Sequence, residues 1–319
     1  MIIEKIDLRE ADAETARRVY DVVVAVENDL VPEGPTLLLE QELDFLATMG
    51  SWTRVEQFVA WTADRSEALG FASAEWETLE ENSDLGGVAC WVRPGARGNG
   101  IGRELVRRAL AVLKAEGRTK IYADVWEGSP GEAFATGLGL EPKLRERFSR
   151  CQVADIDLRM LRAWVDRAKE RADGYTLLQW NSPTPEEHLE ELARIVNFMN
   201  TAPLDDFEME DQVTTPEMLR ERDEALVGAG IRRFTSVVRH DSSGQFAGFT
   251  SMNIDRWHPE QAHQGGTCTD TAHRNKGIGR WLKAANALWM LEECPDVAYI
   301  DTDNAGSNRT MLAINEAMG

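Results

Sequence analysis

Residues in the two halves of this chain recur at one separation, and this repeat constrains the fold more than any other feature. The pairs Arg97/Arg274, Gly100/Gly277, Gly102/Gly279, Leu105/Leu282, Tyr122/Tyr299 and Asp124/Asp301 each differ by 177 positions. Gly70-Phe71 and Gly248-Phe249 differ by 178. A nearly fixed offset across several elements is the signature of an internal repeat. We therefore expect two copies of one domain, for which 319 residues are sufficient.

Apolar periodicity predicts a similar order of elements in both halves. The first half is typical of a strand at 2–7, a helix at 11–26, an antiparallel meander at 57–64, 68–76 and 85–92, a helix opened by glycines near 101, and a strand at 119–126. The second half indicates helices at 186–200 and 216–229, strands at 234–240, 246–254 and 265–271, a helix from 278, and a strand at 297–303. We place the first domain at 1–158, a helical linker at 159–174 and the second domain at 175–319.

The charge balance narrows the class of partner. Lys and Arg number 35 against 55 Asp and Glu, giving a formal net charge of −20. Proteins that bind nucleic-acid phosphates normally carry the opposite sign, whereas a negative field attracts cations such as amines. Since no apolar run reaches membrane-spanning length, we expect no membrane contact and a cytoplasmic location. We expect a monomer or a homodimer.

Cysteine and histidine spacing argues against a metal centre. Cys90, Cys151, Cys268 and Cys294 lie far apart, which favours reduced thiols over a disulfide framework. The five histidines include no pair at the i, i+4 spacing of helical metal ligands. We therefore predict no metal.

The element shared by the two halves is Arg-x-x-Gly-x-Gly between a strand and a helix, at Arg97–Gly102 and Arg274–Gly279. Glycines let the backbone approach a ligand closely, and the first turn of a helix offers unpaired N–H groups to an anion. The spacing differs from the Gly-x-Gly-x-x-Gly loop that binds nicotinamide dinucleotides. Glycines that serve only a tight turn would give the same pattern in one copy, but two copies at one offset favour a pyrophosphate site.

At these loops the chain resembles the GNAT superfamily of acetyl-CoA-dependent N-acetyltransferases, and its tandem arrangement resembles the actinobacterial type that includes mycothiol synthase. The resemblance implies an α/β (α+β) fold of two domains, each a mixed, mainly antiparallel sheet flanked by helices. It also implies that acetyl-CoA binds at both loops, with the pantetheine arm entering where the preceding strand splays from its neighbour. The implied cofactor-binding residues are Val92, Arg97, Gly98, Asn99, Gly100, Ile101, Gly102, Arg103, Thr269, Arg274, Asn275, Lys276, Gly277, Ile278, Gly279, Asn304 and Asn308.

Two departures from the family pattern stand out. Many members place a Tyr four residues before a late glycine, as the acid for the leaving thiolate, whereas Ala135 and Asn315 occupy those positions here. The family also continues through a final hairpin, which is missing after Gly319. We therefore expect the first domain to carry the complete catalytic fold, including a strand-like stretch near 148–158.

Carboxylates on the strands that line the expected cleft are the candidates for the base that deprotonates the amine. We select Glu75, Asp124 and Asp301 as candidate catalytic residues, since burial could raise a carboxylate pKa towards neutrality. The matched positions of Asp124 and Asp301 also fit a purely structural role. The predicted function is transfer of an acetyl group from acetyl-CoA to the primary amine of a small, cationic acceptor by direct attack. The alternative is an acetyl-CoA-binding sensor or structural protein with one or both domains non-catalytic.

Overall fold

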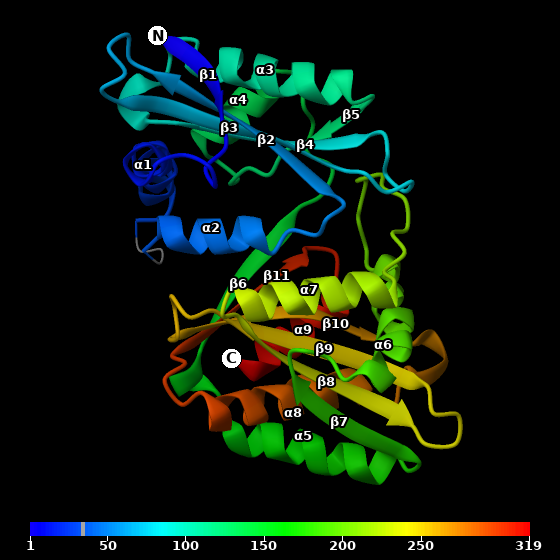
Figure 1. Cartoon of the computed structure of the whole chain (residues 1–319). Helices are drawn as coiled ribbons and strands as arrows, with labels where there is room; N and C mark the ends of the chain where they lie inside the picture. Colours follow the sequence, from blue (N-terminus) through cyan, green and yellow to red (C-terminus); the bar gives the residue numbers. More distant parts are fainter. Residues whose placement is uncertain (33–35) are drawn as a thin grey trace. The chain divides into compact units, whose positions relative to one another are not determined.

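A computed structural model describes residues 1–32 and 36–319, and the chain divides into two compact units, residues 1–142 and 143–319. Each unit contains a twisted sheet with helices on both faces (Figure 1). Within the described ranges, none of the helices combines the length and the apolar composition needed to cross a bilayer.

The sheet of the first unit has the strand order β1-β2-β3-β4-β5. Neighbouring strands are antiparallel except for β4 and β5, which are parallel. The bounds are β1 (Ile2–Ile6), β2 (Thr53–Trp61), β3 (Ala68–Glu77), β4 (Leu85–Val92) and β5 (Lys120–Tyr122). The predicted meander is thus confirmed, with β5 shorter than the sequence indicated.

Helices cover both faces of this sheet because successive strand residues point to opposite sides. Phe71 of β3 packs with α1 in one cluster, and the adjacent Ala72 packs with Leu105 of α3 in another. Figure 1 shows α3 on the side of the sheet opposite α1 and α2. The bounds are α1 (Ala13–Leu30), α2 (Leu39–Ala47), α3 (Ile101–Ala115) and α4 (Pro130–Gly137).

The sheet of the second unit has the order β6-β11-β10-β9-β8-β7, again antiparallel except for the parallel pair β10 and β11. The bounds are β6 (Glu146–Gln152), β7 (Tyr175–Asn181), β8 (Arg232–His240), β9 (Phe246–Ile254), β10 (Gln261–Thr269) and β11 (Tyr299–Ala305). Both sheets are therefore mixed and mainly antiparallel, which confirms the predicted fold class.

The helices of the second unit follow the same plan. Leu282 of α8 and Ala168 of α5 share one apolar cluster, while Ile195 of α6 and Leu219 of α7 share a cluster with β8 and β9. Figure 1 shows α5 and α8 on one side of this sheet and α6 and α7 on the other. The bounds are α5 (Leu158–Arg171), α6 (Leu189–Val196), α7 (Pro216–Gly228), α8 (Ile278–Glu293) and α9 (Arg309–Met318).

The domain boundary lies earlier than the sequence suggested. The chain divides at 142/143, so residues 143–158 belong to the second unit and not to the first. The segment expected to close the first sheet is β6, which pairs antiparallel with β11 from Glu146↔Ala305 to Gln152↔Tyr299. The predicted linker is α5, whose Leu161 is buried in a cluster with residues of α8, β8 and β9. A neighbouring segment of the chain thus supplies the outer strand beside β11, where the sequence suggested a missing hairpin.

Candidate functional site

The first glycine loop has a backbone that requires glycine at two positions. A 3-10 turn (Pro94–Ala96) follows β4, and Gly98 and Gly100 then adopt φ values of +80° and +78°. Gly100 is the N-cap of α3, so the first turn of α3 directs its free N–H groups into the loop. A Cβ at Gly98 or Gly100 would meet no atom within 4 Å, which shows that the loop backbone faces open space.

The second loop repeats this backbone with a different residue. Asn275 stands at the position of Gly98 and has φ +66°, and Gly277 has φ +83° as the N-cap of α8. Asn tolerates the left-handed region better than other side chains, so this replacement preserves the turn. Both loops therefore present the helix-terminus geometry that fits a pyrophosphate.

The loop arginines fold back onto the strands that precede them. Arg97 Nε donates to the carbonyl oxygen of Val92 at 3.2 Å, and Arg274 Nε donates to that of Thr269 at 3.4 Å. Arg97 Nη1 also lies 2.7 Å from Asp29 Oδ2. The charge that we expected beside a pyrophosphate is thus already paired in the first loop, and each arginine closes its loop onto the strand.

The side chains of the other loop residues stabilise the turn and the helix. Asn99 Nδ2 donates to the carbonyl oxygens of Ala96 and Arg97, at 3.2 and 3.3 Å. Ile101 and Ile278 are buried in the core, so these two residues offer a ligand only their backbone. Arg103 is exposed on α3.

The strand before each loop parts from its parallel neighbour, as the resemblance implied. In the described part of the chain, β4 and β5 pair only as far as Gly87↔Tyr122. The pairing of β10 and β11 likewise ends at His263↔Asp301. Because β4 continues to Val92 and β10 continues to Thr269, each strand leaves a stretch without a partner on one side.

The free backbone groups of these stretches face the gap. Arg93 donates its N–H to Leu69 on the side of β3, at 3.0 Å, and Asp270 donates its N–H to Ala247 on the side of β9, at 2.9 Å. Since successive residues of a strand direct their N–H groups to opposite sides, the N–H groups of Val92 and Thr269 face the open gap. This geometry suits the amide groups of a pantetheine arm.

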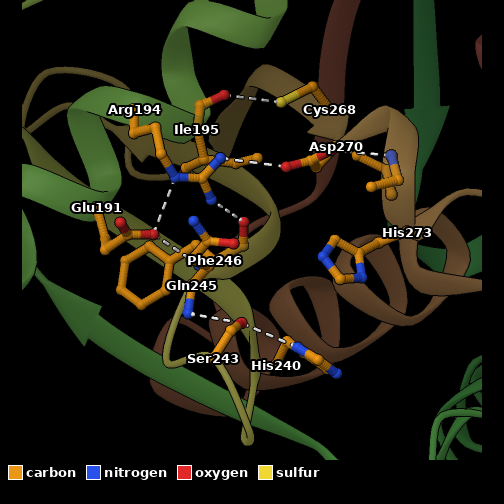
Figure 2. A network of polar contacts seen from close by, with 12 residues as sticks. Glu191, Arg194, Ile195, His240, Ser243, Gln245, Phe246, Cys268, Asp270 and His273 are labelled. Atoms are coloured by element: carbon orange, nitrogen blue, oxygen red, sulfur yellow. Dashed lines mark hydrogen bonds and ion pairs between the residues drawn. The ribbon is translucent and has the colours of Figure 1, made fainter.

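A polar network around Arg194 of α6 holds the end of β10 just before the second loop (Figure 2). Arg194 Nη1 lies 3.1 Å from Asp270 Oδ2, and its Nη2 donates to the carbonyl oxygen of Phe246 at 2.5 Å. Glu191 lies 3.0 Å from Arg194 and accepts from the Phe246 N–H at 2.9 Å. Our sequence reasoning missed this network, although a charged residue inside the apolar stretch Leu192–Val196 is a visible signal.

Two histidines lie beside the same network. His273, directly before Arg274, contacts the Tyr175 hydroxyl through Nδ1 at 2.8 Å, and its ring centroid is 5.1 Å from that of His240 (Figure 2). Burial and neighbouring cations lower the pKa of His273, although Asp270 opposes this shift. Lys276 Nζ lies 5.9 Å from the centroid of the Tyr175 ring.

In the first unit, the predicted acidic residues gather where the strands part. Glu75 of β3 pairs with Gly87 of β4, which in turn pairs with Tyr122 of β5. Burial raises the pKa of Glu75, and the nearby charges of Glu77 and Asp124 add to this rise. Burial and the same carboxylates raise the pKa of Tyr122 to about 12, so its hydroxyl stays protonated at neutral pH.

Asp301, the counterpart of Asp124, has a different environment. Its carboxylate oxygens accept from Arg150 Nε and Nη2, both at 2.8 Å, and Gln261 Nε2 donates to it at 2.9 Å. Arg150 of β6 also lies over the Tyr299 ring, 4.0 Å from its centroid. The expected catalytic carboxylate is thus held in an interstrand ion pair, which fastens β6 to β11.

Asn304 and Asn308 make contacts within the second unit. Asn304 Oδ1 accepts from Asn315 Nδ2 at 2.6 Å, and Asn308 Oδ1 accepts from the Met311 N–H at 3.3 Å as the N-cap of α9. Asn315, which stands where the family often has Tyr, accepts from Lys283 Nζ at 2.6 Å.

Comparisons with a family model and with solved structures point to one kind of fold. Residues 24–133 match the model of the acetyltransferase (GNAT) family. A tandem GNAT protein from the clavulanic acid biosynthesis pathway has 23% sequence identity and a TM-score of 0.78, over 100% of this chain and 94% of that one. A GCN5-related N-acetyltransferase from Sphaerobacter thermophilus has 13% identity and a TM-score of 0.65, over 97% and 88%. No curated protein sequence matches the chain significantly.

These matches include the loop, the parting strands and the helix of the first unit. The more specific likeness to mycothiol synthase stays a prediction. Residues 24–133 thus match the acetyltransferase (GNAT) family model, and the fold of the whole chain is that of a tandem GNAT protein.

Proposed function

We propose that this chain is an acetyl-CoA-dependent N-acetyltransferase that acetylates the primary amine of a small, cationic acceptor in its first domain. The observation that carries the proposal is the row Glu75–Gly87–Tyr122, which lies at the last paired position before β4 and β5 part. A half-buried carboxylate with a raised pKa at this point can accept a proton from an ammonium group.

The cofactor proposal rests on the two loops. The N–H groups of Gly98–Arg103 and of Asn275–Gly279 would bind the pyrophosphate, and Val92 and Thr269 would bind the pantetheine amides. Open space around Gly98 and Gly100 and the left-handed φ values support this assignment. Acetyl-CoA, when bound, supplies the acetyl group as a reactive thioester.

In this proposal, Glu75, the β4 backbone and Tyr122 have separate roles in the reaction. The Glu75 carboxylate would take a proton from the acceptor ammonium, so that the neutral amine attacks the thioester carbonyl directly. The C–N bond would form as the C–S bond breaks, and coenzyme A would leave as a thiolate that takes up the remaining amine proton through solvent. A backbone N–H of β4 beyond Gly87 stabilises the developing charge on the carbonyl oxygen. The Tyr122 hydroxyl would donate to Glu75 or Asp124 and position the carboxylate.

The charge around the site favours a cationic acceptor. The charges of Glu75, Glu77 and Asp124 all raise the pKa of Tyr122, so the three carboxylates lie near its hydroxyl group. The formal net charge of −20 adds a long-range attraction for cations and repels nucleic acid. Polyamines, aminoglycosides and amino sugars therefore form the acceptor class that we propose.

The test is release of free coenzyme A from acetyl-CoA with a panel of such amines. We expect turnover with at least one cationic amine, and loss of that turnover in Glu75→Gln. Affinity for acetyl-CoA without turnover for any amine would contradict the proposal and favour a sensor or structural protein.

A further inference from the structure

The second domain contains a cavity of about 320 Å³ between β6, β11, α8 and α9. Gln264, which lines the cavity, follows His263, the last residue of β10 that pairs with β11. The cavity thus lies where these strands part. The residues that matter for its chemistry are Arg147, Arg150, Cys151, Gln264, Lys283 and Asn315.

Lys283 brings a buried positive charge to this cavity. Its exposed fraction is 3%, and its Nζ donates to Asn315 Oδ1 at 2.6 Å. In the part of the chain that the structure describes, no carboxylate lies within ion-pairing distance of this nitrogen. Burial lowers the pKa of Lys283 to about 8. A buried ammonium without a counter-ion is costly, so a bound anion would stabilise the charged form of Lys283.

The other charged groups of the lining do not supply that anion. Arg147 Nη1 lies 2.6 Å from Glu316 Oε1. Arg150 donates to the Asp301 carboxylate through both Nε and Nη2. Burial raises the pKa of the Cys151 thiol, which keeps it neutral at pH 7. Lys283 therefore has no ion-pair partner among the described residues, although Glu316 and Gly319 also line the cavity.

Gln264 supplies a second unused group. Its exposed fraction is 4%, and its Nε2 donates to Thr250 Oγ1 at 3.1 Å and to the Ser251 carbonyl oxygen at 2.8 Å. Its Oε1 is buried and has no hydrogen-bond partner among the described residues. Buried acceptors are normally paired, so a donor on a bound molecule would complete this site.

The first domain has no counterpart of these groups. At the repeat offset of 177, Lys283 corresponds to Val106 and Gln264 to Gly87, and Asn315 corresponds to Ala135 by its distance of four residues from the late glycine. Val106 packs in an apolar cluster of α3, so the fold itself does not require a lysine at this position. The polar lining is therefore specific to the second domain.

We propose that this cavity binds an aliphatic carboxylate, with its carboxylate on Lys283 Nζ and an N–H of the ligand donating to Gln264 Oε1. The carboxylate belongs either to a free acid or to the acyl chain of a coenzyme A thioester. The second source rests on the proposed function, because the thioester would be held by the loop at Arg274–Gly279. The first source is independent of it.

The first experiment uses N-acetylglycine as the probe, since it carries one carboxylate and one amide N–H. Isothermal calorimetry on the full chain would compare it with N-acetylglycinamide, which lacks the charge. We expect at least tenfold tighter binding of the acid, and loss of this preference in Lys283→Met and in Lys283→Val, which copies the first domain. Lys114→Met, an exposed lysine of α3, is the matched control and should bind as the wild type does.

A second binding experiment identifies the molecule that carries the carboxylate. Glutaryl-CoA would be compared with hexanoyl-CoA, which has an acyl chain of similar length without the charge. A preference for glutaryl-CoA that disappears in Lys283→Met assigns the carboxylate to the acyl chain, whereas Lys283-dependent binding of N-acetylglycine alone assigns it to a free acid. If neither carboxylate shows a dependence on Lys283, the proposal is wrong, and retained acetyl-CoA turnover would show that the proposed function stands.

Discussion

Glu75 on β3 and Tyr122 on β5 are both paired with Gly87 of β4, and a Cβ at Gly87 would lie 2.9 Å from the Tyr122 hydroxyl oxygen. The absence of a side chain at Gly87 therefore lets the tyrosine ring lie over β4, on the strand next to Glu75. Because β4 and β5 part directly after this row, a glutamate and a protonated phenol stand at the entrance of the gap.

Replacing Glu75 by Gln should lower turnover of a cationic amine by about 10²-fold or more, the usual contribution of a general base. The pKa of Glu75 is raised, so the wild-type rate should fall as the pH drops through that pKa, and the variant should lose this dependence. Release of coenzyme A measured against pH checks both effects. Glu116→Gln, at the exposed end of α3, is the control, and an unchanged rate in Glu75→Gln would refute the assignment.

Valine at Gly100 or Gly277 should weaken coenzyme A binding by about tenfold or more in the domain concerned. Both glycines have φ near +80°, a conformation that β-branched residues avoid, so each loop would have to rearrange. Calorimetry on the single variants measures the two sites separately. Gly95→Ala, which has ordinary φ and open space around it, should bind normally. Wild-type affinity at both sites in Gly100→Val and Gly277→Val would mean that these loops do not hold the cofactor.

Asp301→Asn should destabilise the second domain by about 2 kcal/mol, because it removes the buried carboxylate that accepts two hydrogen bonds from the partly exposed Arg150. The exposed fraction of the Asp301 side chain is 1%, and that of Arg150 is 30%. Urea unfolding measures the change, and turnover per folded molecule should stay near the wild-type value. Normal stability together with lost turnover would instead restore the catalytic role that the sequence suggested for Asp301.

Lys283→Met should change how stability depends on pH. The pKa of Lys283 falls from its ordinary 10.5 to about 8 in the folded chain, so between these values the unfolded chain binds more protons. The free energy of unfolding of the wild type should therefore rise relative to the variant by roughly 3 kcal/mol from pH 8 to pH 10.5, and the difference should be constant below pH 8.

Other groups facing Lys283 must be held constant in this comparison. These are the pairs Arg147–Glu316 and Arg150–Asp301 and the Cys151 thiol, whose pKa is raised by burial. Chemical denaturation would thus be measured in a Cys151→Ser background. Parallel stability curves for the two proteins from pH 8 to pH 10.5 would show that Lys283 titrates normally.

Local sequence patterns are sufficient to predict the repeat, the two loops and the order of most strands. The role of Gly100 and Gly277 can be predicted from the sequence, because a left-handed turn before a helix depends on a few adjacent residues. The sequence also shows that Lys283 stands where the first repeat has Val106. Its burial and its lowered pKa, however, depend on contacts with other segments.

The sheet that β6 joins and the contacts of the matched aspartates depend on the tertiary structure. Arg150 and Asp301 are 151 positions apart, and only their pairing assigns residues 146–152 to the second sheet. Asp124 and Asp301 share a place in the repeat, yet one lies near Glu75 and the other is neutralised by Arg150. Backbone preferences act over neighbouring residues, whereas burial, charge pairing and cavities depend on contacts between segments far apart in the chain, which local patterns do not encode.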